Sequence, residues 1–290
     1  MMIPHCFHIG YHKTASTYLQ GEVFQKLAGY FSFMTPEQSY YDGREKLTIP
    51  NSVLAGDPEA PPGRKKLLFS DNRLTGTAYR DDLSFADMIL ATNKNAKIMV
   101  CIRSQFTVLR SYYFTCSKNG YAGSFEKFVH ELAKNGKLQY FTMVSAYRER
   151  FGAGNVKVLF HEDLARDPER FLIGVLDFLG VTEQTAADFS IQRRRESPSD
   201  LVIDSWSLSS RIAAMCGLAP GPAKRAIDHV TVGLAFPASR LWKRIFKTPL
   251  NYRDYGRLAP LIESYWGDSN RRLFDLLGRS ISDYRYPGAR

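Results

Sequence analysis

The feature that most constrains this chain is a recurrence of short apolar runs, each followed by a polar turn and then a segment of helical periodicity. The runs cover residues 5–10, 66–70, 97–102 and 156–160. Short buried strands that alternate with helices are typical of parallel sheets. The sequence therefore predicts an α/β fold with a central parallel sheet and crossover helices, and it places any ligand at the carboxyl ends of the strands.

Towards the C-terminus the strand pattern fades and helical periodicity takes over. Residues 199–215 and 260–277 are predicted to be helices, joined by a basic stretch with proline and glycine over residues 217–257. We therefore expect a core over residues 1–197. A mainly helical, basic lobe of the same domain is expected over residues 198–290.

The first apolar run leads into a loop whose side chains suit an anion. The loop contains His12, Lys13, Thr14, Ala15, Ser16 and Thr17. It is predicted to open a helix, whose N-terminus offers unpaired N–H groups and a positive dipole end. The alternative is an ordinary turn whose hydroxyls cap the helix. Because Lys13 follows Gly10 by three residues and no glycine directly precedes it, the loop is not a Walker A pattern.

The third apolar run ends in Arg103, and Ser111 follows in a segment of helical periodicity over residues 104–113. A helix that begins between two residues at this spacing brings the second back after about two turns. Arginine binds a phosphate bidentately, and serine donates a further hydrogen bond. The pair therefore indicates a second phosphate site, whereas an arginine alone at a strand end is as often a surface ion-pair partner.

The fourth run, residues 156–160, continues into His161-Glu162-Asp163-Leu164, then Asp167-Pro168 and a helical pattern. For Glu162 and Asp163 the sequence favours capping and charge complementarity at a helix N-terminus.

These three motifs, in this order, resemble those of sulfotransferases that use 3′-phosphoadenosine 5′-phosphosulfate (PAPS). The resemblance covers roughly residues 3–181. It implies a three-layer α/β/α core like that of P-loop NTPases and transfer of the sulfuryl group of PAPS to an acceptor hydroxyl. The product would be adenosine 3′,5′-bisphosphate, and no metal would be required.

The resemblance also implies which residues contact PAPS. They are His12, Lys13, Thr14, Ala15, Ser16, Thr17, Tyr18, Arg103, Ser111, His161, Arg193 and Arg195. Ala15 stands where the family has a second glycine. Tyr18 and His161 replace aromatic residues that contact adenine in many members. Arg193 and Arg195 belong to a basic run that either closes over the nucleotide, receives an anionic acceptor, or is a solvated charge run.

Transfer to a hydroxyl needs a general base within hydrogen-bond reach. Family members place a histidine or glutamate on the loop after the second of the four runs, where this chain has Asp71. Asp71 is the first candidate for the catalytic base, Glu37 the second and His12 the third, while Lys13 would neutralise charge on the leaving oxygen. Asp71 also fits two other interpretations: a cap of the following turn, or a magnesium ligand of a P-loop-type kinase that uses Mg-ATP.

The net charge of the chain restricts the classes of possible binding partner only in part. The net charge is +10, and residues 201–290 carry 14 basic and 7 acidic side chains. Such a lobe attracts an anionic nucleotide, an acidic glycan, a phospholipid surface or nucleic acid, unless it is simply a solvated surface. Residues 236–247 combine Trp242 and Phe246 with basic side chains, a mixture that fits a carbohydrate or lipid acceptor and contact with an anionic membrane. Packing of Trp242 into the lobe is the simpler alternative.

A non-catalytic nucleic-acid- or anion-binding protein is the remaining alternative. No recognised nucleic-acid motif supports it, so no nucleic-acid partner is expected. Oligomeric state stays open.

The positions of the cysteines and the lengths of the apolar segments indicate the cellular compartment of the protein. Cys6 and Cys101 lie in apolar runs, which predicts buried free thiols, and the four cysteines show no C-x-x-C spacing. No stretch reaches the roughly 18–20 apolar residues of a membrane span, and the N-terminus lacks a basic signal-peptide region. We therefore expect a cytoplasmic protein.

Overall fold

The computed structural model describes residues 6–27, 29–34, 66–181, 186–189, 199–218, 221–246 and 255–289. The chain divides into two compact units. The first consists of Met1–Ser104, Asn135–Gln192 and Trp266–Arg290, and the second of Gln105–Lys134 and Arg193–Tyr265. The expected boundary between residues 197 and 198 lies outside the described residues and stays a prediction.

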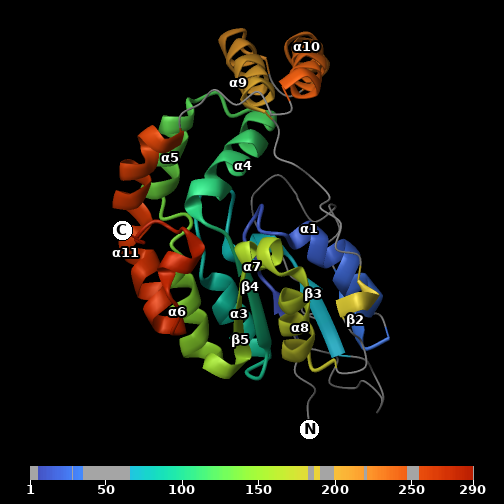
Figure 1. The fold of residues 1–290 in the computed structure, drawn as a ribbon, viewed down its shortest axis with the longest axis vertical. Coiled ribbons are helices and arrows are strands. Elements are labelled where there is room, and N and C mark those ends of the chain that lie inside the picture. Colours follow the sequence, from blue (N-terminus) through green and yellow to red (C-terminus); the bar gives the residue numbers. More distant parts are fainter. Residues whose placement is uncertain are drawn as a thin grey trace. The chain divides into compact units, whose positions relative to one another are not determined.

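The first unit is built on a parallel sheet (Figure 1). Its described strands are β1 Cys6–His8, β2 Phe31–Met34, β3 Lys66–Ser70, β4 Lys97–Ile102 and β5 Val156–Phe160, in the order β2-β3-β1-β4-β5. All neighbouring strands pair in parallel. The predicted α/β fold with a central parallel sheet is therefore confirmed.

Four strands coincide with the predicted apolar runs, although β1 is shorter than expected. Its pairing nevertheless continues beyond the strand, because the Ile9 N–H donates to the Met99 carbonyl (2.9 Å) and the Tyr11 N–H to the Cys101 carbonyl (3.2 Å). Strand β2 was not predicted from the sequence. Four residues at the edge of a sheet carry too short a pattern to stand out from their surroundings.

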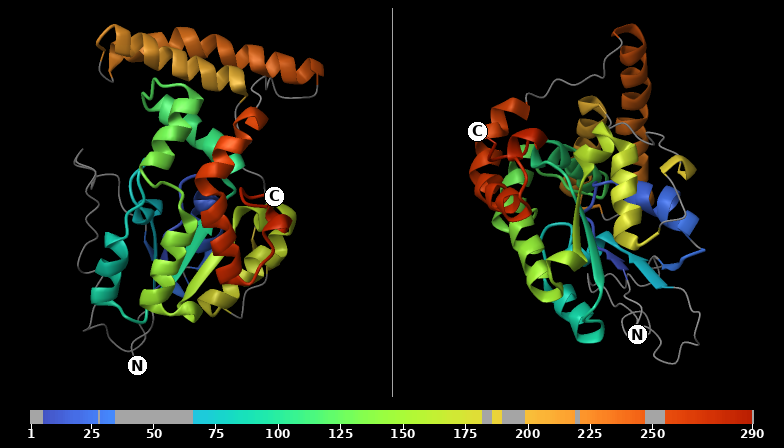
Figure 2. Two further views of the ribbon diagram at one scale, coloured as in Figure 1. Left: turned by 90° about the vertical axis from the view of Figure 1, so that its left-hand side faces the viewer. Right: turned by 60° about the horizontal axis from the view of Figure 1, so that its bottom comes forward.

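Helices cover both faces of the sheet, as Figures 1 and 2 show. One face packs against the helical segment 16–27 and against α8 Pro168–Leu179, in a core that includes Phe24, Cys101 and Leu172. The other face carries α3 Ser84–Thr92, α6 Tyr140–Phe151 and the part of α11 Ala259–Leu277 that belongs to this unit. This arrangement gives the expected α/β/α layers.

The segment after β1 changes helix type along its length. It consists of α1 Ser16–Tyr18, the π-helix η1 Leu19–Val23 and the 3-10 helix η2 Phe24–Leu27. Single π-helical turns are rare and often lie near functional sites. Other short helices of the first unit are η4 Asn72–Thr75, η5 Ala153–Asn155, α7 His161–Arg166, η6 Ala186–Asp188 and η8 Ile281–Tyr284.

The second unit is helical. Its described helices are α4 Gln105–Lys118, α5 Phe125–Lys134, α9 Asp200–Met215, α10 Pro222–Phe246 and η7 Tyr255–Leu258, together with the start of α11. Figure 2 shows α9 and α10 lying side by side. The sequence predicted α9 and α11 closely.

The interpretation of residues 217–257 as a joining stretch was wrong, since α10 occupies 25 of these residues with Pro237 inside it. Proline normally ends or kinks a helix because it lacks an N–H and crowds the preceding turn. Here packing of α10 against α9 outweighs that local cost, which sequence reading could not detect.

Cys6, Cys101 and Cys116 are buried free thiols and Cys216 is an exposed one, as expected for the first two. Within the described ranges, no helix is both long and apolar enough to cross a membrane.

Candidate active site

The order of the strands brings three predicted loops to one edge of the sheet. Strand β1 pairs with β3 on one side and β4 on the other, and the Asp71 N–H donates to the His8 carbonyl at 3.0 Å. The chain places β2 and β3 on one side of β1 before it crosses to β4 and β5. Ligands of open parallel sheets bind at such a crossing, outside the carboxyl ends of the strands.

The loop after β1 adopts a backbone conformation that few side chains favour. Lys13 has φ 67° and Ala15 has φ 75°, both in the left-handed region. Each such residue other than glycine costs about 1–2 kcal/mol, and strain of this kind is often found at ligand-binding sites. Backbone turns that alternate handedness can direct successive N–H groups at an anion. The glycine expected from the family resemblance would remove this cost at Ala15.

The hydroxyls of the loop are not equivalent. Thr14 is buried and donates to the Tyr11 carbonyl, so it holds the loop together. The Oγ of Ser16 is buried without a hydrogen-bond partner in the part of the chain that the structure describes, and Thr17 is exposed. An unpaired buried hydroxyl costs free energy unless something binds it. Ser16 is therefore the better candidate for a ligand contact.

Tyr18 packs, partly buried, against the apolar core beneath the loop. Burial raises the pKa of its hydroxyl. The predicted contact of this ring with adenine stays a prediction.

Arg103, at the end of β4, lies against the Lys13 loop. Its Nη1 donates to the Lys13 carbonyl at 3.3 Å, and its own carbonyl accepts from the Tyr140 hydroxyl at 2.7 Å. Burial lowers the pKa of the guanidinium, and the nearby Glu162 carboxylate opposes that shift. Two cationic residues that were predicted to bind phosphates thus come from neighbouring strands to one place.

Glu162 has partners that the sequence did not indicate. Its Oε1 accepts from the Ser104 N–H at 2.9 Å and its Oε2 accepts from the Tyr286 hydroxyl at 3.1 Å. Ser104 in turn donates to the Arg285 carbonyl at 2.9 Å. Residues near the C-terminus therefore support the backbone directly after Arg103.

The other predicted nucleotide contacts differ in how the structure places them. His161 opens α7, and burial, followed by the charge of Arg103, lowers its pKa to about 4, so its imidazole is neutral. Ser111 is buried on α4 in the second unit, so its pairing with Arg103 stays a prediction. Glu37, Arg193 and Arg195 lie outside the described residues.

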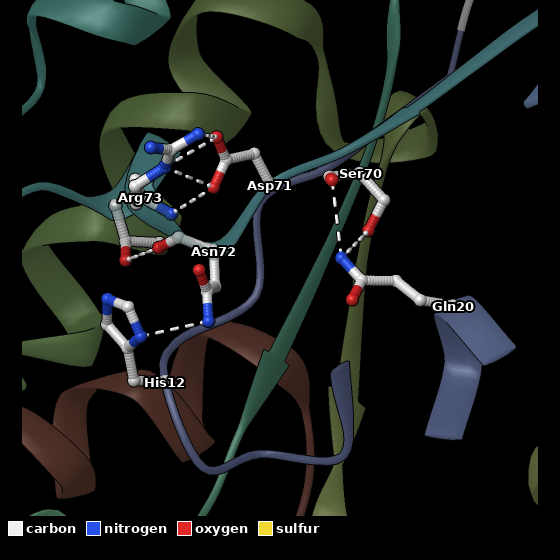
Figure 3. Close-up of polar contacts among 7 residues, drawn as sticks. His12, Gln20, Ser70, Asp71, Asn72 and Arg73 are labelled. Atoms are coloured by element: carbon white, nitrogen blue, oxygen red, sulfur yellow. Dashed lines mark hydrogen bonds and ion pairs between the residues drawn. The ribbon is translucent and has the colours of Figure 1, made fainter. Parts of the chain in front are cut away.

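Asp71 is held by its neighbour Arg73 (Figure 3). Its Oδ1 accepts from the Arg73 N–H at 2.8 Å, and its Oδ2 lies 2.9 Å from Nε and 2.8 Å from Nη2 of Arg73. Asp71 therefore caps the turn of η4, which is one of the alternatives that the sequence left open. Nε of Arg73 also donates to Oδ1 at 3.1 Å, so each carboxylate oxygen already has two contacts with Arg73. Asp71 would therefore have to give up one of these contacts to accept a proton from a substrate hydroxyl.

His12 also reaches the β3 loop. The amide nitrogen of Asn72 lies 2.9 Å from Nδ1 of His12 (Figure 3). Because an amide nitrogen only donates, Nδ1 accepts and the neutral ring carries its proton on Nε2. Burial lowers the pKa of His12 to about 3, and the charges of Lys137, Lys13 and Arg73 act in the same direction.

A buried ion pair behind the loop was not found from the sequence. Lys137 is fully buried, with its Nζ 3.0 Å from Oδ1 of Asp81. The Tyr11 hydroxyl donates to Oδ2 of Asp81 at 2.8 Å, which ties the pair to the residue next to His12. Burial lowers the pKa of Lys137 and raises that of Asp81, while each charge opposes the shift of the other. No local pattern marks either residue, because only tertiary packing buries them.

A second buried cluster joins β1, β3 and the helical segment after the loop. Nδ1 of His8 lies 2.7 Å from Oγ of Ser70. The Gln20 amide donates to the same oxygen at 2.9 Å (Figure 3). A Cβ at Gly10 would lie 2.8 Å from Nε2 of His8. Gly10 therefore serves close packing at the start of the loop.

Within the described residues, no group of three or more His, Cys, Asp or Glu side chains is arranged to hold a metal ion.

Comparison with known proteins gives one family. Residues 86–207 match the family described as the sulfotransferase domain. This match includes Arg103 and His161 but begins after the Lys13 loop and Asp71. Comparison with curated proteins gave no match.

Among solved structures, the chain is similar to a sulfotransferase from Alicyclobacillus acidocaldarius, with 16% identity, a TM-score of 0.44, and coverage of 78% of this chain and 100% of the other. It is also similar to the sulfotransferase domain from the curacin biosynthetic pathway, with 14% identity, a TM-score of 0.42, and coverage of 76% and 99%. A third is the sulfotransferase domain of the Synechococcus PCC 7002 olefin synthase, with 15% identity, a TM-score of 0.38, and coverage of 81% and 94%.

Proposed function

We propose that the chain is a sulfotransferase that transfers the sulfuryl group of PAPS to an acceptor hydroxyl at the carboxyl edge of β3, β1 and β4. The match of residues 86–207 to the sulfotransferase domain supports this proposal. The observation that carries this proposal is the contact between Arg103 and the Lys13 loop. PAPS has phosphate groups at two ends of its ribose. A donor site must therefore supply two cationic positions close together.

The described residues fit such a ligand. Lys13 is exposed on a strained turn suited to an anion, and Ser16 has an unpaired buried hydroxyl beside it. When bound, PAPS would supply the activated sulfuryl group. Lys13 would hold the phosphosulfate and neutralise charge on the leaving oxygen, and Arg103 would hold the 3′-phosphate.

His12 is suited to orient the donor. With Nδ1 occupied by Asn72, its Nε2–H is the group that can donate to an anionic oxygen. Because its pKa is about 3, the ring stays neutral at physiological pH and adds a dipole rather than a charge. This geometry favours a positioning role for His12 over its role as third candidate for the base.

Asp71 remains our first candidate for the base. It belongs to the loop that adjoins the Lys13 turn, and Arg73 fixes the orientation of its carboxylate. A carboxylate whose orientation is already fixed loses no further conformational entropy when it accepts a proton from an acceptor hydroxyl. The acceptor itself is proposed to be a carbohydrate or a lipid, on the basis of the basic and aromatic side chains after residue 200.

Thermal stabilisation by adenosine 3′,5′-bisphosphate, compared with Mg-ATP, tests the donor site. A ligand at about 100 times its dissociation constant stabilises the native state by about 2.7 kcal/mol. Lys13→Ala and Arg103→Ala should each abolish most of the shift. Lys94→Ala, at an exposed lysine of the same unit, should leave it unchanged. Absence of a shift with the bisphosphate in the parent chain would refute the proposal.

Turnover separates the remaining alternatives. Asp71→Asn should remove sulfuryl transfer and leave the thermal shift intact, whereas loss of both would make Asp71 a structural residue. Transfer that survives EDTA supports the sulfotransferase, while strict dependence on Mg-ATP would support the kinase. A nucleic-acid-binding protein would instead bind oligonucleotides with a steep dependence on salt and discriminate poorly among adenine nucleotides.

A further inference from the structure

We propose that α9 and α10 dock on an anionic lipid surface through an exposed apolar face flanked by basic side chains. The apolar face consists of Leu208, Met215, Val230, Leu234, Leu241 and Ile245. Each of them exposes more than half of its surface, from 51% for Leu208 to 84% for Met215. Exposed apolar surface gathered in one place, unlike scattered single residues, marks an interaction site.

The four members on α10 form one continuous row. Val230, Leu234, Leu241 and Ile245 follow one another at intervals of four, seven and four residues. Residues at these intervals share one face of an α-helix. With a rise of about 1.5 Å per residue, the row runs for about 22 Å along the helix.

Helix α9 contributes two exposed apolar residues to the same side of the α9–α10 pair. Leu208 and Met215 are seven residues apart and so share a face of α9. Leu208 and Leu234 line a single groove between the two helices, with Arg211 at its wall. The exposed leucines of α9 and α10 therefore face a common side.

The opposite side of α10 is already used for packing. Val232 and Ala235 are buried, and the carboxylate of Asp228 accepts from the Ser209 hydroxyl of α9. Lys224 lies 2.8 Å from Oδ1 of the same carboxylate. The apolar face is consequently surplus to what the helix pair needs for its own stability.

The basic side chains of α10 indicate which kind of partner fits the apolar face. Helix α10 has five basic residues and one acidic residue, Asp228, which is paired with Lys224. The other four basic residues, Arg225, Arg240, Lys243 and Arg244, are exposed. In the ranges that the structure describes, Arg240 and Arg244 form no ion pair.

This combination suits a helix that lies in the plane of an anionic membrane. Apolar side chains enter the headgroup boundary while basic ones meet the lipid charge. Trp242, which is 38% exposed on the same helix, is an aromatic residue of the kind found at that depth. A second copy of the chain is a poorer partner, because a symmetric contact would bring the two sets of unneutralised arginines together.

Vesicle binding by the full chain tests this proposal. Vesicles of phosphatidylcholine alone would be compared with vesicles that contain about one third phosphatidylglycerol. We expect co-sedimentation with the anionic vesicles only, weakened by salt. Arg240→Gln with Arg244→Gln should lower the partition coefficient about 30-fold, from about 1 kcal/mol per basic side chain. Leu234→Gln with Leu241→Gln should lower it at least tenfold.

Matched controls separate this face from charge in general. Lys127→Gln with Lys134→Gln removes two exposed lysines of α5 in the same unit and should change the partition less than twofold. Anionic vesicles should also shift the tryptophan emission to the blue, and Trp242→Phe should remove that shift. Glutamine is compatible with a helix, and circular dichroism would check that each variant is folded.

Several results would overturn the proposal. They are equal binding to neutral and anionic vesicles, no binding to either, or an arginine variant no weaker than the α5 control. A concentration-dependent dimer that Leu234→Gln with Leu241→Gln abolishes, without vesicle binding, would assign the face to a second copy. Salt-sensitive binding of an RNA oligomer without vesicle binding would assign it to nucleic acid. All these measurements are made without nucleotide, so their outcome is independent of the donor-site experiment.

Discussion

Replacing Gly10 by alanine should destabilise the protein through a single steric conflict. The added Cβ would lie 2.8 Å from Nε2 and 3.2 Å from Cε1 of His8, and 3.3 Å from Cβ of Cys101. The His8 ring cannot move away easily, since it is fully buried, lies 2.7 Å from the Ser70 hydroxyl and packs edge-on against Phe24 at 5.4 Å. Overpacking of this kind costs about 1–3 kcal/mol.

A double-mutant cycle isolates that conflict. Gly10→Ala is made in the parent chain and in a His8→Ala background, and urea unfolding is followed by circular dichroism. We expect the alanine to cost about 1–3 kcal/mol in the parent chain and little in the second background, which gives a coupling energy of similar size. Gly154→Ala is the control, because a Cβ there would meet nothing within 4 Å.

The reasoning would be refuted if Gly10→Ala cost the same in both backgrounds. In that case Gly10 would act through the backbone of the loop rather than through His8. A cost for Gly154→Ala as large as that for Gly10→Ala would also contradict it, because the effect would then be a general one of replacing glycine.

Three further predictions concern the same region. Ala15→Gly should raise the melting temperature by removing about 1 kcal/mol of left-handed strain, and a lower melting temperature would contradict the backbone geometry. Lys137→Met should cost about 3–5 kcal/mol because it leaves the largely buried Asp81 carboxylate without its cationic partner; urea unfolding measures this, and we expect Lys137→Met with Asp81→Leu to recover most of the loss. The pKa of His8 is lowered by burial to about 3 from 6.5, so the unfolded state binds more protons between these values. The contribution of His8 to the free energy of unfolding is therefore complete above pH 6.5. It falls as the pH drops towards 3, by up to about 1.4 kcal/mol per pH unit. A His8→Gln variant should reduce the slope of urea midpoint against pH across this range, while His12 and His161, whose pKa values are also lowered, keep their own contributions. A slope equal to that of the parent chain would argue against the shift.

Local pattern was sufficient to predict most of the sheet and to place Lys13 and Arg103 at one edge of it. Strands β3, β4 and β5 are continuous apolar runs, and α8 begins at Asp167-Pro168 and ends at Gly180, which takes the left-handed φ of 73°. Such signals are local because capping and burial on both faces of a strand depend on nearby residues. The same holds for Arg103, which directly follows β4, and for Lys13, which lies in the loop after β1 at the same edge of the sheet.

The sequence by itself therefore determined the parallel α/β fold, and its resemblance to sulfotransferases led to the prediction that the Lys13 loop binds phosphate. Only the tertiary structure decided that Arg103 contacts that loop, that Arg73 holds Asp71, and that a buried Lys137 lies behind His12. The physical reason is range. Helix caps and strand runs are written in neighbouring residues, whereas burial of a charge and the meeting of residues 90 positions apart depend on how the strands are ordered in the sheet.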